Sequence, residues 1–191
     1  SKDKTFLQVE TDFPLEDDVL KSLPLSPDVT VMDFMLVRSD KYDTLVGNED
    51  CSIVVARGEE VLSDGMKVNI LANTVGVGAD FAQRRIARKV EGYRAANCLD
   101  LYVCYHRGEP IGLCELFMNG DVAKIEDFEI LEAYQKKGFG TSVLKHLMGQ
   151  AKEQGAEWAY LITDNADTAK EMYLKCGFEF AGQKTQLHFT L

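Results

Sequence analysis

Residues 125–148 read IEDFEILEAYQKKGFGTSVLKHLM and pass from a strand-like pattern, through two glycines, into a helix-like one. Residues 122–131 have the pattern of a strand, whereas the apolar side chains of residues 139–151 recur at helical spacing. A helix that begins at glycines gathers unpaired backbone N–H groups and the positive end of its dipole at one spot. Gly138 and Gly140 carry no Cβ that would crowd a phosphate oxygen there. The stretch therefore predicts an anion site.

The glycines fit neither of two common nucleotide-binding motifs. A GxGxxG motif would need glycine where Val143 stands, and the chain lacks the Gly-Lys-Ser/Thr sequence of a P-loop. Binding of a nicotinamide dinucleotide or of ATP at a P-loop is therefore not indicated. Lys136 and Lys137, just before the glycines, can add positive charge to the site. Taken alone, the glycines also fit a helix that merely starts there, so both interpretations stay open at this point.

Outward from this stretch, strands and helices follow one another toward the C-terminus. Residues 99–106, 111–118 and 122–131 predict three consecutive antiparallel strands joined by the turns RGEP and NGD. The remaining elements are predicted as an amphipathic helix over 81–93, a helix over 139–154, a buried strand over 158–163, a helix over 164–176 and a closing hairpin over 178–191. Together they predict an α/β protein with a mixed sheet.

The N-terminal part differs in charge from the rest. Residues 1–80 hold 7 basic and 16 acidic side chains, or −9, whereas residues 81–191 hold 14 and 15, or −1. Its predicted elements are a short helix over 15–23 and strands over 30–37, 52–56 and 68–72. Two glycines in NTVGVG, residues 73–78, mark a boundary or a connecting turn. We therefore expect a smaller strand-rich acidic part, residues 1–75, and a main domain, residues 76–191.

Composition excludes several classes of protein. The chain has 191 residues, of which 46% are hydrophobic and 27% charged, and no stretch approaches the about 18 consecutive apolar residues of a membrane span. A net charge of −10 disfavours general binding to nucleic acid. The 5 cysteines form no Cys-x-x-Cys pair and stand at no metal-ligand spacing from the 3 histidines. We expect thiols in a reducing cytoplasm and no metal, and the oligomeric state stays open, a homodimer included.

Two motifs together carry a resemblance to a known family. The residues from Gln135 to Gly140 resemble the Gln/Arg-x-x-Gly-x-Gly/Ala pyrophosphate loop of the GCN5-related N-acetyltransferase (GNAT) family. Residues 165–178, NADTAKEMYLKCGF, are similar to that family's later motif, in which a strand ends at Asn and the next helix ends in Tyr-x-x-x-Gly-Phe. The resemblance covers about residues 79–191 and implies an acyl-CoA N-acyltransferase fold. Residues 1–75 resemble a partial or degenerate copy of the same fold.

The resemblance implies that acetyl-CoA is the acyl donor and binds where two neighbouring parallel strands splay apart. The backbone of Phe128 and Ile130 would pair with the pantetheine arm as an extra strand would. Asn165 and Ala169 would flank the pantetheine and its thiol, and Tyr173 would point its hydroxyl at the sulfur. The pyrophosphate would bind to Gln135, Lys136, Lys137, Gly138, Phe139, Gly140 and Thr141.

Acetyl transfer to an amine needs a base, because an alkylammonium with a pKa near ~10.4 must lose its proton before it attacks the thioester. Asp127 and Glu126, on the strand before the loop, are the candidates, and strand alternation predicts that they lie on opposite faces. Asp127 precedes the loop glutamine at the spacing of an acidic residue that some small-amine and aminoglycoside members of the family use. Glu126 is the second candidate.

Two further groups complete the expected reaction. The resemblance assigns the tetrahedral oxyanion to a backbone N–H near Ile130. Tyr173 would give a proton to the departing thiolate, and a core aromatic is its alternative role. Cys176 has no histidine near it in sequence, so direct transfer in a ternary complex is favoured over an acyl-cysteine intermediate.

The sequence therefore predicts an N-acetyltransferase that moves an acetyl group from acetyl-CoA to a primary amine of a small molecule or peptide. An acidic N-terminal wall would favour cationic amines, although acidity also serves solubility. One alternative is a non-catalytic acyl-CoA-binding or protein-interaction module, which would bind without turnover. Another is a factor that modifies tRNA or protein, for which the basic residues between 84 and 89 are the candidate surface.

Overall fold

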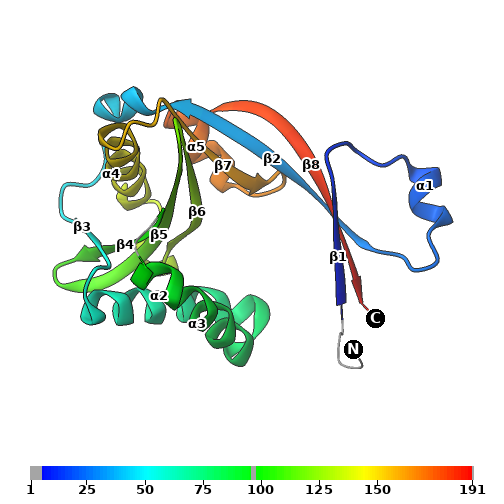
Figure 1. The fold of residues 1–191 in the computed structure, drawn as a ribbon, viewed down its shortest axis with the longest axis horizontal. Helices are drawn as coiled ribbons and strands as arrows, with labels where there is room; N and C mark the ends of the chain where they lie inside the picture. The colour runs from blue at the N-terminus through cyan, green and yellow to red at the C-terminus, as the bar shows by residue number, and fades with distance from the viewer. Residues whose placement is uncertain (1–5, 96–97, 191) are drawn as a thin grey trace. The chain divides into compact units, whose positions relative to one another are not determined.

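The structure is a computed structural model that describes residues 6–95 and 98–190 (Figure 1). The described residues form two compact units. Unit 1 contains the residues up to Leu36 together with those from Leu161 onward, and unit 2 contains Val37–Tyr160. The first and the last described strands therefore belong to one unit, and the predicted cofactor loop belongs to the other.

Unit 2 is built on a mixed sheet. Its antiparallel strands follow the order β3-β4-β5-β6, and the first residues of β7 pair in parallel with β6, from Val122↔Trp158 to Lys124↔Tyr160. The predicted meander of three consecutive strands is confirmed. The strands are β3 (Ser52–Val55), β4 (Leu99–His106), β5 (Glu109–Asn119), β6 (Val122–Ile130) and the beginning of β7 (Trp158–Asp164), whose residues from Leu161 onward belong to unit 1.

Helices cover both faces of this sheet. Leu101 and Leu113 pack into one apolar cluster with Leu62 of α2 and Ile86 of α3. Tyr102 points to the other face, where its ring meets His146 of α4 with centroids 5.5 Å apart. This division follows from the alternation of side chains along β4, and Figure 1 shows α4 and the α2–α3 pair on opposite sides. The helices are η1 (Ser39–Thr44), α2 (Glu59–Val77), α3 (Ala79–Ala95), η2 (Glu132–Tyr134) and α4 (Phe139–Glu153).

Unit 1 holds the remaining strands and two short helices. β8 lies between β1 and β2 and pairs antiparallel with both, and the N–H of Asn165, just after β7, donates to the carbonyl of Val31 at 2.9 Å. These elements are β1 (Phe6–Thr11), α1 (Asp17–Ser22), β2 (Asp28–Arg38), α5 (Ala169–Lys175) and β8 (Glu179–Thr190).

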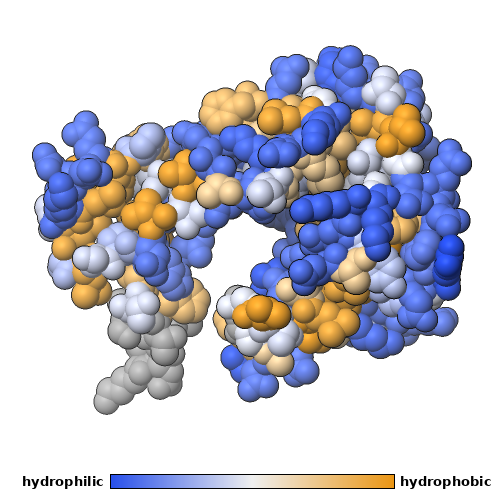
Figure 2. Space-filling view, turned by 180° about the vertical axis from the view of Figure 1, so that it is seen from behind, coloured by the Kyte–Doolittle hydropathy of each residue, from blue (hydrophilic) through white to orange (hydrophobic). Residues whose placement is uncertain are grey.

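Several large apolar side chains of unit 1 are exposed. Phe13 is 61% exposed and Leu7 50%, and Figure 2 shows hydrophobic residues at the surface of the molecule. Such surface is typical of a contact with another chain, and the oligomeric state, a homodimer included, stays open. In the described part of the chain, no helix combines the length and apolar character that crossing a membrane requires.

Three sequence-based predictions differ from the structure. Residues 68–72 lie inside α2, because their β-branched run is part of a longer helix whose inner face is buried. Residues 179–190 form the single strand β8 instead of a hairpin, since β1 and β2 supply its partners; Leu191 lies outside the described residues. The expected domain boundary after residue 75 falls within α2, and residues 52–75 belong to unit 2. Residues 1–75 therefore do not form a body of their own.

Asn69 of α2 gives a stability prediction. Its side chain is fully buried, and neither Oδ1 nor Nδ2 has a hydrogen-bond partner among the described residues. An unpaired buried amide costs about 1–3 kcal/mol, and alanine also favours the helix, so Asn69→Ala should raise the thermal midpoint by about 2–4 °C in calorimetry. Asn73→Ala is the control, because that side chain donates to the Asn69 carbonyl at 2.9 Å. A lower midpoint for Asn69→Ala would contradict the prediction.

Candidate functional site

The predicted cofactor loop joins the end of η2 to the start of α4. Gly138 immediately precedes α4 in the left-handed conformation, with φ 85°, and no side chain caps the helix there. Phe139 and Gly140 are the first residues of α4, so their N–H groups have no acceptor within the helix. Thr141 follows in the same turn, and Lys136 also has a positive φ of 58°. The structure thus brings the predicted loop residues together at a helix N-terminus.

Two side chains of the loop are used within the protein. The Nε2 of Gln135 donates to the carbonyl of Ile130 at 2.9 Å and ties the loop to the end of β6. The ammonium of Lys137 donates to the carbonyl of Ala133 at 2.7 Å and lies 5.7 Å from the centre of the Tyr134 ring. Both bonds fix the loop conformation without using the backbone N–H groups at the start of α4.

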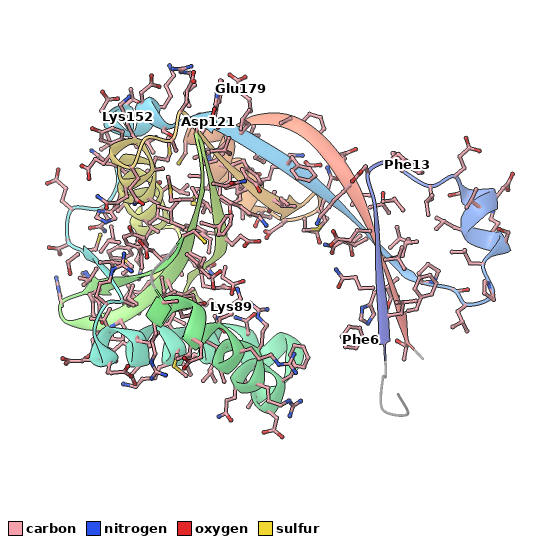
Figure 3. The ribbon with its side chains drawn as sticks, viewed as in Figure 1. Phe6, Phe13, Lys89, Asp121, Lys152 and Glu179 are labelled. Atoms are coloured by element: carbon pink, nitrogen blue, oxygen red, sulfur yellow. The ribbon has the colours of Figure 1, made fainter. Side chains whose placement is uncertain are left out.

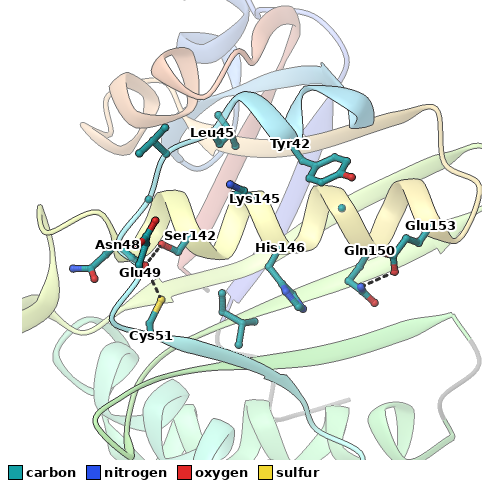
Figure 4. A pocket seen from close by; sticks show the side chains of 14 residues that line it. Tyr42, Leu45, Asn48, Glu49, Cys51, Ser142, Lys145, His146, Gln150 and Glu153 are labelled. Atoms are coloured by element: carbon teal, nitrogen blue, oxygen red, sulfur yellow. Dashed lines mark hydrogen bonds between the residues drawn. The ribbon is translucent and has the colours of Figure 1, made fainter.

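A segment far away in sequence, Gly47–Asn48, packs against this loop and was not predicted (Figure 4). Asn48 donates twice, from its backbone N–H to the Gly138 carbonyl at 3.2 Å and from Nδ2 to the Lys137 carbonyl at 2.9 Å. The hydroxyl of Ser142 donates to the Asn48 carbonyl at 2.8 Å. A Cβ at Gly47 would fall 2.6 Å from the backbone nitrogen of Ser142, so the approach requires glycine.

A cavity of about 440 Å³ lies between this segment and the adjoining side of α4. Its lining includes Lys145, His146 and Glu153 of α4, and Figure 4 shows Gln150 and Glu153 hydrogen-bonded to each other on the same helix. Burial lowers the pKa of His146, which keeps its ring neutral at physiological pH. The candidate bases Glu126 and Asp127 are not among its lining residues, so this groove is separate from the expected reaction centre.

The candidate bases lie at an irregularity of β6. The β5–β6 register passes from Leu113↔Glu129 to Glu115↔Glu126, so Asp127 and Phe128 both stand opposite the single residue Cys114. This is a β-bulge, and Asp127 adopts a positive φ of 42° there. The parallel pairing of β6 with β7 runs only as far as Lys124. The irregular part of β6 therefore begins just beyond the residues that pair with β7.

The bulge overturns the expectation that Glu126 and Asp127 lie on opposite faces. Glu126 stands directly opposite Glu115, so the two side chains share a face. Asp127 contacts the ammonium of Lys89, which also binds Glu115, and is therefore on that face too. The extra residue shifts the alternation by one position, which sequence periodicity alone does not reveal.

Asp127 is part of a cluster of charged side chains on β5, β6 and α3. Arg85 binds one of its oxygens at 2.9 Å, and Lys89 binds the other at 2.8 Å. Lys89 also donates to both oxygens of Glu115 at 2.9 Å, and the hydroxyl of Tyr93 donates to the same carboxylate. Glu115 is only 1% exposed, whereas Lys89 is 31% exposed. Figure 3 shows Lys89 at the place where α3 meets the sheet.

The pKa values follow from these contacts. Burial alone would raise the pKa of Asp127, but Lys89 and Arg85 outweigh burial and lower it. For Glu115, burial and the charge of Asp127 raise the pKa, and Lys89 and Tyr93 offset this only in part. Burial opposes the charged form of Lys89, yet the two carboxylates raise its pKa. Near neutral pH, Lys89 and Asp127 are therefore both charged.

These contacts bear on the choice of base, which stays a prediction. Asp127 is held by two cations, and a carboxylate with a lowered pKa is a weaker proton acceptor. Glu126 forms one ion pair, with Lys124, and its side chain is 42% exposed. The geometry therefore favours Glu126 over Asp127 for taking a proton.

In unit 1, Asn165 is fixed by a buried carboxylate that was not predicted to contribute. Its Nδ2 donates to both oxygens of Asp33 at 3.1 Å, and Asp33 is fully buried. Gln183 donates to the same carboxylate at 2.8 Å, and the ammonium of Lys170 completes the set. Burial alone would raise the pKa of Asp33, but its hydrogen-bond donors, Lys170 first among them, lower it. These bonds hold Asn165 in one orientation.

Ala169 and Tyr173 lie on α5 of the same unit. Ala169 begins the helix, and its N–H donates to Oδ1 of Asp167 at 2.9 Å. The buried ring of Tyr173 meets the ring of Phe178 edge-on, with centroids 5.9 Å apart. This packing agrees with the alternative role of Tyr173 as a core aromatic and leaves its predicted role as an acid untested. Across residues 6–95 and 98–190, no group of three His, Cys, Asp or Glu side chains forms a candidate metal site.

Comparison with known sequences finds a matching family and a relative. A model of the acetyltransferase (GNAT) family matches residues 75–178. The chain is 34% identical over 136 residues to the uncharacterised N-acetyltransferase CgeE of Bacillus subtilis (strain 168), a match that covers 68% of this chain and 52% of CgeE. The chain thus spans about half the length of this relative.

Solved structures share the fold at low sequence identity. A conserved protein of unknown function from Staphylococcus epidermidis ATCC 12228 is 19% identical, with a TM-score of 0.82 over 97% of this chain and 73% of its own. The PaiA N-acetyltransferase of Thermoplasma acidophilum, solved in complex with coenzyme A, is 16% identical, with a TM-score of 0.55 over 73% of this chain and 99% of its own. Since the family match also spans more than half of the sequence, the chain belongs to the GNAT family of acetyltransferases.

Proposed function

We propose that the protein transfers an acetyl group from acetyl-CoA to a primary amine of a small molecule or peptide. The observation that carries this proposal is the start of α4, where left-handed Gly138 leaves the first helical N–H groups available to an anion. Membership of the GNAT family supports an acyl-CoA as the anion bound there. The five cysteines are all free thiols, which supports the cytoplasmic location expected from the sequence.

In this proposal, the loop from Gln135 to Thr141 binds the pyrophosphate mainly through backbone N–H groups. Lys136 and Lys137, which belong to the loop, add positive charge. The backbone of Phe128 and Ile130 pairs with the pantetheine arm, which the end of the β6–β7 pairing at Lys124 supports. Asn165 and Ala169 take the pantetheine contacts that the family motif gives them.

The reaction proceeds by direct attack in a ternary complex. Glu126, or a water that it orients, takes a proton from the acceptor ammonium, and the neutral nitrogen then attacks the thioester carbonyl. A backbone N–H near Ile130 stabilises the oxyanion. The carbon–sulfur bond then breaks, Tyr173 gives a proton to the departing thiolate, and the acylated nitrogen loses its surplus proton to water, which leaves a neutral amide. Cys176 is buried, in keeping with a route that needs no acyl-cysteine.

An amine panel tests the proposed function. Acetyl-CoA is supplied with each amine in turn: polyamines, aminoglycosides, amino acids and basic peptides. The release of free CoA thiol is measured by the absorbance of a thiol-reactive reagent. We expect a cationic primary amine to stimulate thiol release, because the chain carries a net charge of −10. CoA binding without release for any amine would instead support the non-catalytic acyl-CoA-binding module.

Gly138→Asp tests the pyrophosphate site. The carboxylate would stand beside the bound phosphates, so the Kd for CoA in titration calorimetry should rise at least tenfold, or about 1.4 kcal/mol. Gly138→Asn is the matched control, since it brings the same bulk to the left-handed position and the same approach of Cβ to Asn48, 3.2 Å from its backbone nitrogen. Asp should weaken binding more than Asn. Unchanged affinity in a folded Gly138→Asp variant would remove the cofactor assignment.

Tyr173→Phe tests the proposed acid. The substitution keeps the ring that packs on Phe178, so folding and CoA affinity should be preserved. General acids contribute ~10²–10⁴-fold, and we expect a fall in kcat near the lower end because water can partly replace a phenol. The fall of the wild-type rate at high pH, where the phenol ionises, should disappear in the variant. A variant that keeps both the wild-type kcat and this high-pH fall would leave Tyr173 a packing residue only.

A further inference from the structure

The bulge on β6 is held in a conformation that its residue type does not favour. Asp127 has a φ of 42°, in the left-handed region that side chains with a Cβ rarely adopt, although aspartate tolerates it better than most. Opposite the bulge, the thiol of Cys114 donates to the carbonyl of Glu126 at 3.5 Å. The backbone of β6 therefore departs from the regular ladder just before Ile130.

Helix α3 supplies the groups that hold this conformation. Arg85 and Lys89 are four residues apart and lie on the same side of the helix, so both reach the Asp127 carboxylate, at 2.9 and 2.8 Å. Lys89 is itself anchored by Glu115, which is buried and also receives the hydroxyl of Tyr93. Arg85 and Lys89 both bind Asp127, and Lys89 also links it to Glu115. The cluster fixes a strand through a side chain rather than through backbone pairing.

A bulge changes the direction of the backbone groups that follow it. In the proposed function, the N–H that stabilises the oxyanion lies near Ile130, a few residues after Asp127. A loss of the contacts at Asp127 would let the bulge relax and would turn these N–H groups away from the position where charge develops. A misplacement of this kind lowers the rate of the chemical step more than it lowers binding of the cofactor.

We propose that Arg85 and Lys89 are positioning residues for acetyl transfer: by binding the carboxylate of Asp127 they hold the β6 bulge and aim the backbone N–H groups that follow it at the oxyanion. This inference rests on the proposed function. It gives Asp127 a different task from that of a base, because its carboxylate orients the backbone and takes no proton from the acceptor.

A series at Asp127 separates the two tasks. Asparagine tolerates a positive φ and keeps one side-chain acceptor for Lys89. Glycine tolerates a positive φ but has no acceptor, and alanine has neither property. For a positioning residue, kcat should decrease in the order Asn, Gly, Ala, with alanine at least tenfold below wild type and with the acid limb of the pH profile in place in all three. Equal losses in the three variants, together with loss of the acid limb, would identify Asp127 as the base and overturn the proposal.

Lys89→Met tests the helix side of the contact without relying on turnover. Amide hydrogen exchange of a peptide covering residues 125–131 should become at least tenfold faster, while CoA affinity stays within about twofold of wild type. Arg88→Met is the matched control, because Arg88 is an exposed neighbour on the same helix and should leave exchange unchanged. Lys89→Arg, which keeps the charge, should restore slow exchange.

The outcomes distinguish this inference from the proposed function. Unchanged exchange in a folded Lys89→Met variant overturns the inference, whatever the activity. Faster exchange with a lower kcat for the panel's best amine supports it, and faster exchange with wild-type kcat overturns the positioning role. A wild-type protein that transfers acetyl to no amine contradicts the proposed function, while exchange still decides whether Lys89 holds the bulge. Should Lys89→Met fail to fold, the Asp127 series decides alone.

Discussion

The arrangement of unit 2 depends on the two ion pairs that the ammonium of Lys89 forms. The ammonium joins Glu115 of β5 to Asp127 of β6, so one side chain of α3 contacts two neighbouring strands. Without a cation, two charged carboxylates this close together would repel each other, and Glu115 would be a buried charge that accepts the hydroxyl of Tyr93 but lacks its contact with Lys89. A shift of helix α3 along the sheet would move Lys89 away from the two carboxylates and would therefore cost electrostatic free energy. The position of the helix and the shape of β6 are set together.

The sequence predicted those elements whose signals are local and periodic. The three strands of the meander alternate in polarity and are joined by turn residues, and α4 has apolar side chains at helical spacing. Predictions failed where a distant part of the chain decides the outcome. Residues 68–72 have strand-like composition but lie in a long helix that packs on β4 and β5. Glu126 and Asp127 share a face because of a bulge stabilised from α3.

The candidate site divides in the same way. Gly138 before α4 is a local signal. Glycine adopts the left-handed conformation easily because it has no Cβ, so this helix start can be predicted from the residue itself. Asn48 gave no such signal, since its bonds to the loop join residues about 90 positions apart. The sequence also contained no sign of the role of Asp33. An aspartate within a strand pattern is ordinary, and its role follows only from its contacts with Asn165 and Lys170 in the folded chain. Polar partners of this kind are visible only once the chain is folded.

Gln135 shows how β6 and the loop depend on each other. In the resemblance it belongs to the pyrophosphate loop, yet its side-chain amide donates to the carbonyl of Ile130. The N–H of Leu131 donates to the carbonyl of Ile111 at 2.9 Å, so the same strand end is also fixed from β5. Because the side-chain amide of Gln135 is used in this bond, an anion would be bound by the backbone N–H groups of α4 and by the neighbouring lysines. The direction of those N–H groups then depends on where β6 ends, and the strand that carries the bulge also orients the loop.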